Sequence, residues 1–457
     1  MYICATNVNL TAITMNFRFR DKELDILRNM RWLSEQQHSR FTLLYGEPGS
    51  GKTRLVSEAL KGFPCLWVCP GEITEALLLE SLSAQAVEVM GAPLPDNIKD
   101  MEDFLNFMFN TGHEISFSVI IKEFQDLDPG TFALLRRLWG VNRLSTHINL
   151  VLVSSDLSYI RKLDANPNLA FNNLDSRILL VPFSLAEQRS VLESMPGFKE
   201  GSEEERADAV LAMFGVSGGM PSIVTEIHDS GAWKASGIMA VALSGHSSAR
   251  RLWSGVISNV LGKNSESYCS VLQVISRGSR SQADIEAHVG SGNLGGHLAR
   301  LEQDYCLLGR SRPVFSDGKS RGVVRYGFLN PSLEFWFAQG FALDHRGFSP
   351  ERAIAAAREG WQSYSVRVMR RFFAKRLQEE NGYTNVGSWW EPATRNQVRK
   401  GIDLVAWRDT DKKILVADVC RDEESFDSEG FVKRVNRLSA STGHRKVDAR
   451  LFTLKDI

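Results

Sequence analysis

Residues 46–53 have the sequence GEPGSGKT, which is the most specific motif in the chain. It matches the pattern G-x-x-x-x-G-K-[ST] at Gly46, Gly51, Lys52 and Thr53. The apolar segment FTLLYG comes directly before it, and the segment GKTRLVSEALKG, which has helical spacing, continues from it. Because the pattern requires a strand before it and a helix after it, this context favours a phosphate-binding loop over an ordinary glycine-rich turn.

Each residue type in the loop has a chemical role. Glycines, here Gly46, Gly49 and Gly51, allow backbone N–H groups to turn inward around phosphate oxygens, and the start of the helix adds a favourable dipole. Lys52 would contact the β and γ phosphates, and the hydroxyl of Thr53 would bind Mg²⁺. The sequence therefore predicts binding of ATP or ADP with Mg²⁺.

The segments around the loop alternate in character. Strands are predicted at 41–46, 65–69, 116–124, 148–155 and 177–183, and helices at 51–62, 73–90 and 130–140. This alternation predicts an α/β fold in which helices cover a parallel sheet. After Pro182 three helical segments follow, interrupted by Gly218 and Gly219, and predict a small helical lid subdomain.

The rest of the chain predicts two further modules. Helices at 267–278, 281–290 and 292–303 precede two strands within 305–329, which is a winged-helix pattern. A long helix at 350–380 then precedes strands near 401–407 and 413–420, a helix at 428–441 and a strand at 449–454. The predicted domains are 15–183 (nucleotide binding), 184–250 (lid), 251–345 (winged helix) and 350–457 (a small α/β domain).

Composition limits the class of protein. The 457 residues suggest about three domains, and 43% hydrophobic with 24% charged residues is typical of a soluble globular protein. A formal net charge of +0 indicates no global attraction to nucleic acid or membrane. No apolar run is long enough for a membrane span, no signal peptide is expected, and the 6 scattered cysteines lack zinc spacing. A cytoplasmic location is expected.

Other motifs occur in a characteristic order. FRFRDKEL places Phe17, Arg20, Glu23 and Leu24 ahead of the loop, SVIIKEFQ ends an apolar strand in charged residues, and VPFSLAE and GGMPSIV follow. With these motifs the chain resembles archaeal-type AAA+ ATPases, whose members often continue into a winged helix and a PD-(D/E)XK nuclease-like domain. The resemblance covers nearly the whole chain and implies that Arg20 belongs to the nucleotide site.

One position departs from that family. Its strand usually ends in Asp-Glu, where the aspartate orders Mg²⁺ and the glutamate positions the attacking water. Here Lys122 replaces the aspartate while Glu123 remains as the catalytic candidate. Lys122 either places positive charge near the phosphates or turns aside to pair with Glu114, Asp126 or Asp128. In both cases Mg²⁺-dependent hydrolysis is expected to be weakened.

Two other catalytic places are also altered or ambiguous. Ser154 or Ser155 at the end of the fourth strand could orient water or phosphate, or could cap the next helix. The family's paired arginine would fall at Asn172, Asn173 and Leu174, with Arg177 displaced from it. An arginine finger can contribute several orders of magnitude in rate. We therefore expect nucleotide binding with slow or absent turnover.

The winged helix suggests contact with DNA. Its third helix offers His297 and Arg300, and its wing offers a set of basic side chains: Arg310, Arg312, Lys319, Arg321 and Arg325. Such charges would contact phosphates without reading bases. The alternative is a packing module with solvated charges that links domains.

The last domain resembles the nuclease fold with an altered site. Asp403 and Asp418 suit the two metal-binding carboxylates. Cys420 stands at the lysine position, Ser365 is closest to the helix glutamate of the family, and Lys433 could substitute for the lysine. The alternative is that both aspartates are solvated strand-end carboxylates.

Together these patterns predict an ATP-binding, AAA+-like switch that acts on DNA or a protein partner. The rival hypothesis is an active ATPase coupled to a metal-dependent nuclease. A third is a scaffold in which DNA has no part.

Overall fold

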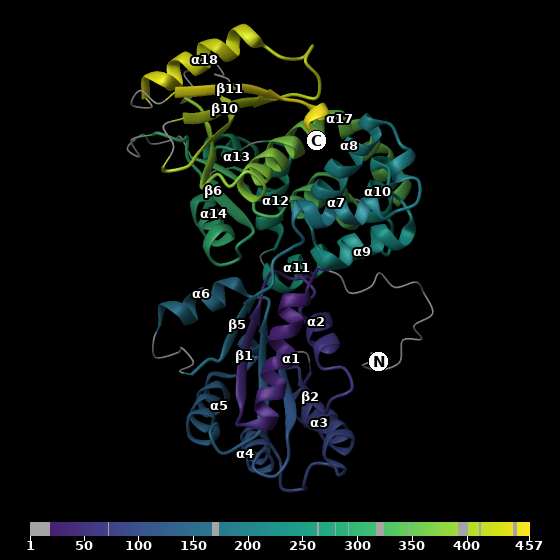
Figure 1. Ribbon diagram of the computed structural model, residues 1–457, viewed down its shortest axis with the longest axis vertical. Helices are drawn as coiled ribbons and strands as arrows, with labels where there is room; N and C mark the ends of the chain where they lie inside the picture. Colours follow the sequence, from purple (N-terminus) through teal and green to yellow (C-terminus); the bar gives the residue numbers. More distant parts are fainter. Residues whose placement is uncertain are drawn as a thin grey trace. The chain divides into compact units, whose positions relative to one another are not determined.

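The computed structural model describes residues 19–71, 73–166, 173–262, 265–278, 280–290, 292–316, 324–345, 347–391, 401–410, 413–441 and 446–457. The described chain up to Val181 forms one compact unit, and Pro182–Ile457 forms another (Figure 1). Among these residues no helix combines the length and the apolar character that crossing a membrane requires.

The first unit is built on a five-stranded parallel sheet with the order β2-β3-β4-β1-β5. Its strands are β1 (Arg40–Tyr45), β2 (Cys65–Val68), β3 (Phe117–Lys122), β4 (Ile148–Ser154) and β5 (Ser176–Leu179). Its helices are α1 (Asp21–Gln36), α2 (Lys52–Ala59), α3 (Glu75–Met90), α4 (Met101–Thr111), α5 (Pro129–Asn142) and α6 (Leu157–Ala165). The predicted α/β class with a parallel sheet is confirmed.

Helices cover both faces of this sheet (Figure 1). Val119 and Ile121 of β3 pack into the core shared with α3, α4 and α5, whereas Ile120 packs into the core shared with α1 and α2. Successive side chains of a strand point to opposite faces. Lys122, two residues after Ile120, therefore lies on the face covered by α1 and α2.

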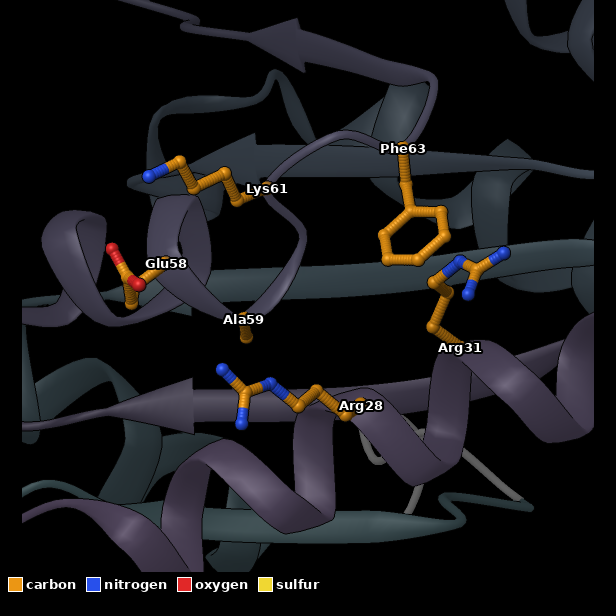
Figure 2. Close-up of a pocket in the computed structure, with 6 residues that line it drawn as sticks. All are labelled: Arg28, Arg31, Glu58, Ala59, Lys61 and Phe63. Atoms are coloured by element: carbon orange, nitrogen blue, oxygen red, sulfur yellow. The ribbon is translucent and has the colours of Figure 1, made fainter.

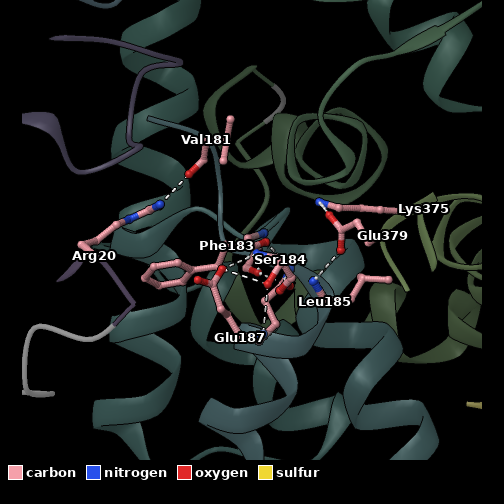
Figure 3. A network of polar contacts seen from close by, with 11 residues as sticks. Arg20, Val181, Phe183, Ser184, Leu185, Glu187, Lys375 and Glu379 are labelled. Atoms are coloured by element: carbon pink, nitrogen blue, oxygen red, sulfur yellow. Dashed lines mark hydrogen bonds and ion pairs between the residues drawn. The ribbon is translucent and has the colours of Figure 1, made fainter. Parts of the chain in front are cut away.

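The second unit begins with a helical subdomain: α7 (Leu185–Glu193), α8 (Glu203–Ala212), a π-helical turn (Met213–Ser217), α9 (Pro221–Ser230) and α10 (Ala235–Ala242). Ser184 and Glu187 form a capping box at the start of α7, which Figure 3 shows. The N–H of Phe183 donates to the carbonyl of Gly219 (2.8 Å). A Cβ on Gly219 would lie 2.4 Å from the Phe183 carbonyl oxygen, so this contact requires a glycine.

Helix α11 (Ser248–Val260) leads into the three helices and hairpin that the sequence predicts. The elements are α12 (Ser265–Ser276), α13 (Gln282–Val289), α14 (Leu294–Gln303) and the antiparallel pair β6 (Leu308–Ser311) and β7 (Arg325–Phe328). After them come α15 (Pro331–Phe335), a π-helical turn (Trp336–Gly340) and α16 (Phe341–His345).

The chain ends in a four-stranded sheet between two helices. The elements are α17 (Pro350–Glu379), β8 (Asn385–Trp389), β9 (Ile402–Trp407), β10 (Lys413–Val419), α18 (Ser428–Ser441) and β11 (Lys446–Phe452). The order is β11-β10-β9-β8, and only the β10–β11 pair is parallel. Helix α18 lies along one face, where Phe431 and Leu438 pack on the strands, and α17 contacts β8, β9 and β10 (Figure 1).

Polar contacts join the helical subdomain to this last domain. Arg421 donates to both carboxylate oxygens of Asp208 (2.8 and 2.9 Å), and Trp361 of α17 donates to the same carboxylate (3.1 Å). The N–H of Leu185 donates to Glu379 at the end of α17 (3.0 Å; Figure 3). Pro182–Ile457 is therefore held together by specific pairs as well as by apolar packing.

Candidate functional site

The predicted phosphate loop connects β1 to α2. Gly49 (φ 82°) and Gly51 (φ 91°) have left-handed backbone conformations, which glycine adopts without strain. The N–H of Gly46 donates to the carbonyl of Ser154 at the end of β4 (3.3 Å). A Cβ at Gly46 would lie 2.2 Å from the Leu180 carbonyl oxygen, so only glycine fits where the loop passes β5.

Lys52 lies inside this loop. Its ammonium donates to the carbonyls of Gly46 (2.8 Å) and Glu47 (2.9 Å) and to the hydroxyl of Ser50 (3.4 Å), and only 6% of the residue is exposed. Burial lowers the pKa of Lys52 to about 8, while the carboxylates of Glu123 and Glu47 act in the opposite direction. A buried ammonium inside a loop of inward-turned backbone fits a polyphosphate. The negative phosphates would compensate the positive charge, which is costly to bury alone.

A pH dependence follows from this lysine. Bound phosphate stabilises the charged ammonium, so affinity for ATP or ADP should fall as pH rises through the pKa of about 8 of the ligand-free protein. Proton linkage predicts binding about tenfold weaker at pH 9 than at pH 7. Titration with nucleotide at both pH values measures this loss. Lys52→Arg, which stays charged over this range, is the control and should show a much smaller loss; equal losses in both proteins would contradict the assignment.

Glu123 follows β3 directly and is tightly held. Its backbone is left-handed (φ 45°), and its carboxylate accepts from the Ser155 hydroxyl (2.6 Å), the Ser155 N–H (2.8 Å) and the Gln125 amide (2.9 Å). The Gln125 carbonyl in turn accepts from the Ser154 hydroxyl (2.7 Å). The structure thus brings the predicted Glu123, Ser154 and Ser155 together, and Gln125, whose role the sequence did not indicate, connects them.

The alternative in which a serine caps the next helix is wrong. Asp156 is the N-cap of α6, and its carboxylate accepts from the N–H of Tyr159 (2.8 Å). The hydroxyl of Ser154 accepts from the N–H of Asp156 (3.1 Å), which orders the turn before the helix. Both serines therefore serve the Glu123 network.

Lys122 is half-buried at the end of β3, opposite Val153 of β4. Carboxyl ends of parallel strands meet at one edge of a sheet, and β3 is two strands from β1, so Lys122 lies about 10 Å from the end of the strand that carries the loop. Two of the three carboxylates predicted to pair with Lys122 are excluded. Glu114 precedes the opposite end of β3, about 16 Å away, and the carboxylate of Asp128 caps α5 by accepting from Gly130 and Thr131.

The arginine candidates are engaged within the first unit. Arg177 of β5 donates to both oxygens of Asp164 (2.8 and 2.7 Å) and to the hydroxyl of Tyr45 (3.1 Å). Arg20, 6% exposed, donates to the carbonyl of Val181 (2.6 Å; Figure 3) and lies 3.7 Å from Glu23. Phe17 and Asn172 lie outside the described residues. Asn173 and Leu174 lead into β5, and Asn173 has a left-handed backbone (φ 72°).

In the last domain the two predicted aspartates meet. The N–H of Asp403 donates to the carboxylate of Asp418 (3.4 Å), and the N–H of Val419 donates to that of Asp403 (3.1 Å). Each carboxylate also has an arginine that the sequence did not indicate: Arg370 of α17 lies 2.9 Å from Asp403, and Arg434 of α18 donates to Asp418. Burial and then Asp403 raise the pKa of Asp418, and Arg434 opposes them. The aspartates are thus paired with cations rather than solvated.

The remaining predicted nuclease residues do not place a lysine ammonium beside Asp403 and Asp418. Lys433 is 70% exposed and lies 3.9 Å from Glu429, so α18 presents Arg434 to the carboxylates and Lys433 to solvent. The predicted substitution by Lys433 is wrong on this geometry. Burial raises the pKa of the Cys420 thiol, and Ser365 accepts from Arg421 (2.7 Å). No group of three or more His, Cys, Asp or Glu residues in the described parts of the chain could hold a metal ion.

The basic residues of the helix–hairpin module differ in their surroundings. Arg300 donates to the hydroxyl of Tyr268 (3.2 Å), against which His297 also packs. Arg310 lies 3.2 Å from Glu302, and Arg312 is exposed. The guanidinium of Arg325 lies over the ring of Trp390 (4.3 Å), and Lys319 and Arg321 lie outside the described residues.

A separate pocket of about 380 Å³ lies beside the carboxyl end of α2 (Figure 2). It is lined by Arg28, Arg31, Glu58, Ala59, Lys61 and Phe63. The phosphate loop is at the other end of this helix, whose eight residues span about 12 Å. The pocket is therefore distinct from the phosphate loop.

Comparisons with known proteins give similarity of structure only. No protein-family model matches the sequence, and no curated protein matches it. Similar solved structures include a Walker-type ATPase of Pyrococcus abyssi (15% identity, 70% of this chain, 95% of that chain, TM-score 0.46). Another is the ORC2 protein of Aeropyrum pernix (15% identity, 77% of this chain, 98% of that chain, TM-score 0.44). A third is the ORC1 protein of the same organism in complex with DNA (14% identity, 71% of this chain, 92% of that chain, TM-score 0.38). At these identities and TM-scores, function has to be argued from the site of this chain.

Proposed function

We propose that the protein is a nucleotide-dependent switch that binds ATP or ADP at residues 46–53 and hydrolyses ATP slowly or not at all. The observation that carries this proposal is a complete phosphate loop, with Lys52 buried inside it, at the same sheet edge as Lys122. Gly46, Gly49 and Gly51 shape the loop, Lys52 neutralises phosphate charge, and the exposed Thr53 would supply a hydroxyl to Mg²⁺.

Two features support slow turnover. Lys122 occupies the place where a carboxylate would order Mg²⁺, and its positive charge disfavours a divalent cation nearby. The carboxylate of Glu123 already accepts three hydrogen bonds from Ser155 and Gln125, so its oxygens are engaged by the protein and less available to position a water molecule. The site can therefore hold phosphates better than it can activate water.

The proposal is tested at Lys122. Lys122→Asp should raise Mg²⁺-dependent phosphate release by about tenfold or more, because a restored carboxylate can hold the metal that neutralises the developing charge. Lys22→Asp makes the same charge change on an exposed side chain of α1 and should leave the rate unchanged. An unchanged rate in Lys122→Asp, with nucleotide binding retained, would mean that Lys122 is not what limits hydrolysis.

The output of the switch is proposed to be contact with DNA or a protein partner through Pro182–Ile457. Exposed Arg312 and partly exposed Arg310 on the hairpin support contact with a nucleic-acid backbone. Slow hydrolysis would give the bound state a long lifetime, which suits a switch better than a motor.

A metal-dependent nuclease is the second candidate. It is favoured by the element order α17-β8-β9-β10-α18-β11 and by the contact between Asp403 and Asp418, which would be its catalytic and metal-binding residues. The arginines on both carboxylates oppose it, because a divalent cation would have to displace them. Nicking of plasmid DNA with Mg²⁺ or Mn²⁺ that disappears in Asp403→Ala would favour this candidate.

A further inference from the structure

One buried carboxylate in the second unit is surrounded by an excess of arginines. Glu334 of α15 has a side chain that is only 5% exposed. Arg371 lies 2.6 Å from it, Arg280 3.6 Å and Arg367 3.8 Å. One carboxylate can neutralise one guanidinium, so this group carries uncompensated positive charge.

Two more arginines extend the group, giving what we call the arginine cluster: Arg280, Arg325, Arg367, Arg370 and Arg371. Burial lowers the pKa of Arg325, and so do Arg280 and Arg370, while Asp284 and Asp403 act in the opposite direction. Burial also lowers the pKa of Arg280, and Arg367, Arg371 and Arg370 lower it further against Glu334.

Among the described residues, the carboxylates that face the cluster are Glu334, Asp403 and Asp284. Five arginines therefore meet three carboxylates, in a chain whose formal net charge is +0. This excess is local, and local excess of one sign raises the concentration of counter-charged ligands at a surface.

The cluster is assembled from two modules. Arg280 and Arg325 come from the helix–hairpin module, and Arg367, Arg370 and Arg371 lie on one face of α17 because their spacing is i, i+3 and i+4. The side chains of Arg280 and Arg370 are 38% and 46% exposed, so the cluster borders solvent even though burial lowers the pKa of Arg280. Folding has thus brought repelling cations together, which costs free energy unless an anion binds there.

Resting on the proposed DNA contact, we propose that the arginine cluster is a phosphate-binding site for the backbone of duplex DNA. The planar guanidinium fork matches phosphate oxygens in pairs and stays charged at all physiological pH values. On the hairpin, Ser311 pairs with Arg325, so Arg310 and Arg312, which flank Ser311, point to the opposite face and are not part of the cluster. A group of five arginines fits a polyanion better than a single phosphate group.

The test measures binding of the full-length chain to a fluorescent duplex of about 30 base pairs across a salt series. Arg280→Gln combined with Arg367→Gln should weaken binding about tenfold or more at about 100 mM salt, and should reduce the salt slope by about 2. Arg450→Gln, which removes an exposed arginine of β11 paired with Asp448, is the matched control and should change neither quantity.

Arg280→Gln alone guards against a variant that fails to fold, because the ion pair of Arg280 with Glu334 is long (3.6 Å) and contributes little to stability. It should reduce the salt slope by about 1 while thermal unfolding stays as in the wild type. If the wild type binds DNA and these variants keep its affinity and slope, the cluster is not the site, and DNA contact elsewhere survives. If the wild type binds no duplex even at low salt, the proposed DNA contact and this site both fail.

Discussion

Lys52→Ala is expected to weaken the binding of ATP or ADP by about 10- to 100-fold, since hydrogen bonds to a charged group contribute about 1.5–3 kcal/mol. The ammonium of Lys52 is the buried cation of the phosphate loop, 2.8 and 2.9 Å from two loop carbonyls that hold it in place. Without it, the loop retains only backbone N–H groups for the phosphates. Titration of the purified protein with a fluorescent nucleotide measures the change.

Lys61→Ala is the matched control for this experiment. Lys61 is exposed beyond the far end of α2 and lines the separate pocket of Figure 2. Its loss should leave nucleotide affinity unchanged. Thermal unfolding should show that wild type and Lys52→Ala are both folded. If the two proteins then bind nucleotide with equal affinity, the phosphate loop is not the nucleotide site.

Glu334→Ala is expected to destabilise the second unit by about 3–5 kcal/mol, because it leaves buried like charges without their carboxylate. Arg371 would lose its 2.6 Å partner, and Arg280 and Arg367 would repel it without compensation. Denaturant unfolding followed by tryptophan fluorescence measures the free energy of unfolding, with the transition of each compact unit analysed separately.

Glu380→Ala is the comparison for that substitution. Glu380 is 44% exposed and pairs with Arg376 (3.1 Å), and an exposed ion pair of this kind contributes about 0.5 kcal/mol or less. A loss in Glu334→Ala no larger than in Glu380→Ala would show that the arginine cluster is not electrostatically dependent on Glu334.

Much of the fold was predictable because its signals are local. Hydrophobic periodicity located β1, α2 and α17, and the glycines with Lys52 marked the turn between the first two. The resemblance to the nuclease fold, rather than periodicity, singled out Asp403 and Asp418, and the pairing of β9 with β10 brings them together.

Side-chain partners were less predictable, because they depend on helical phase and on contacts between distant segments. Lys433 and Arg434 differ by one residue, about 100° around α18, and only packing decides which of them meets Asp418. Arg370 on α17 pairs with Asp403 on β9, and no local sequence pattern predicts a pair between such distant segments. Asp156 is different: an aspartate directly before a helix is a recognisable cap signal, and it could have been preferred to a serine.

The direction of Lys122 was also open in the sequence, and the two cores of the sheet narrow it without excluding a pair with Asp126. Strand alternation places it on the face of α1 and α2, with Ile120, and the positions of Glu114 and Asp128 remove two alternative partners. Its charge therefore lies on the same face and the same edge of the sheet as the phosphate loop.

We propose that this protein binds a nucleotide without hydrolysing it at a substantial rate. The most direct measurement follows bound nucleotide and released phosphate in one sample of wild-type protein with ATP and Mg²⁺. We predict close to one bound nucleotide per chain and far less than one phosphate released per chain during the lifetime of the complex. Repeated rapid turnover by the wild type, with Lys122 in place, would contradict the account.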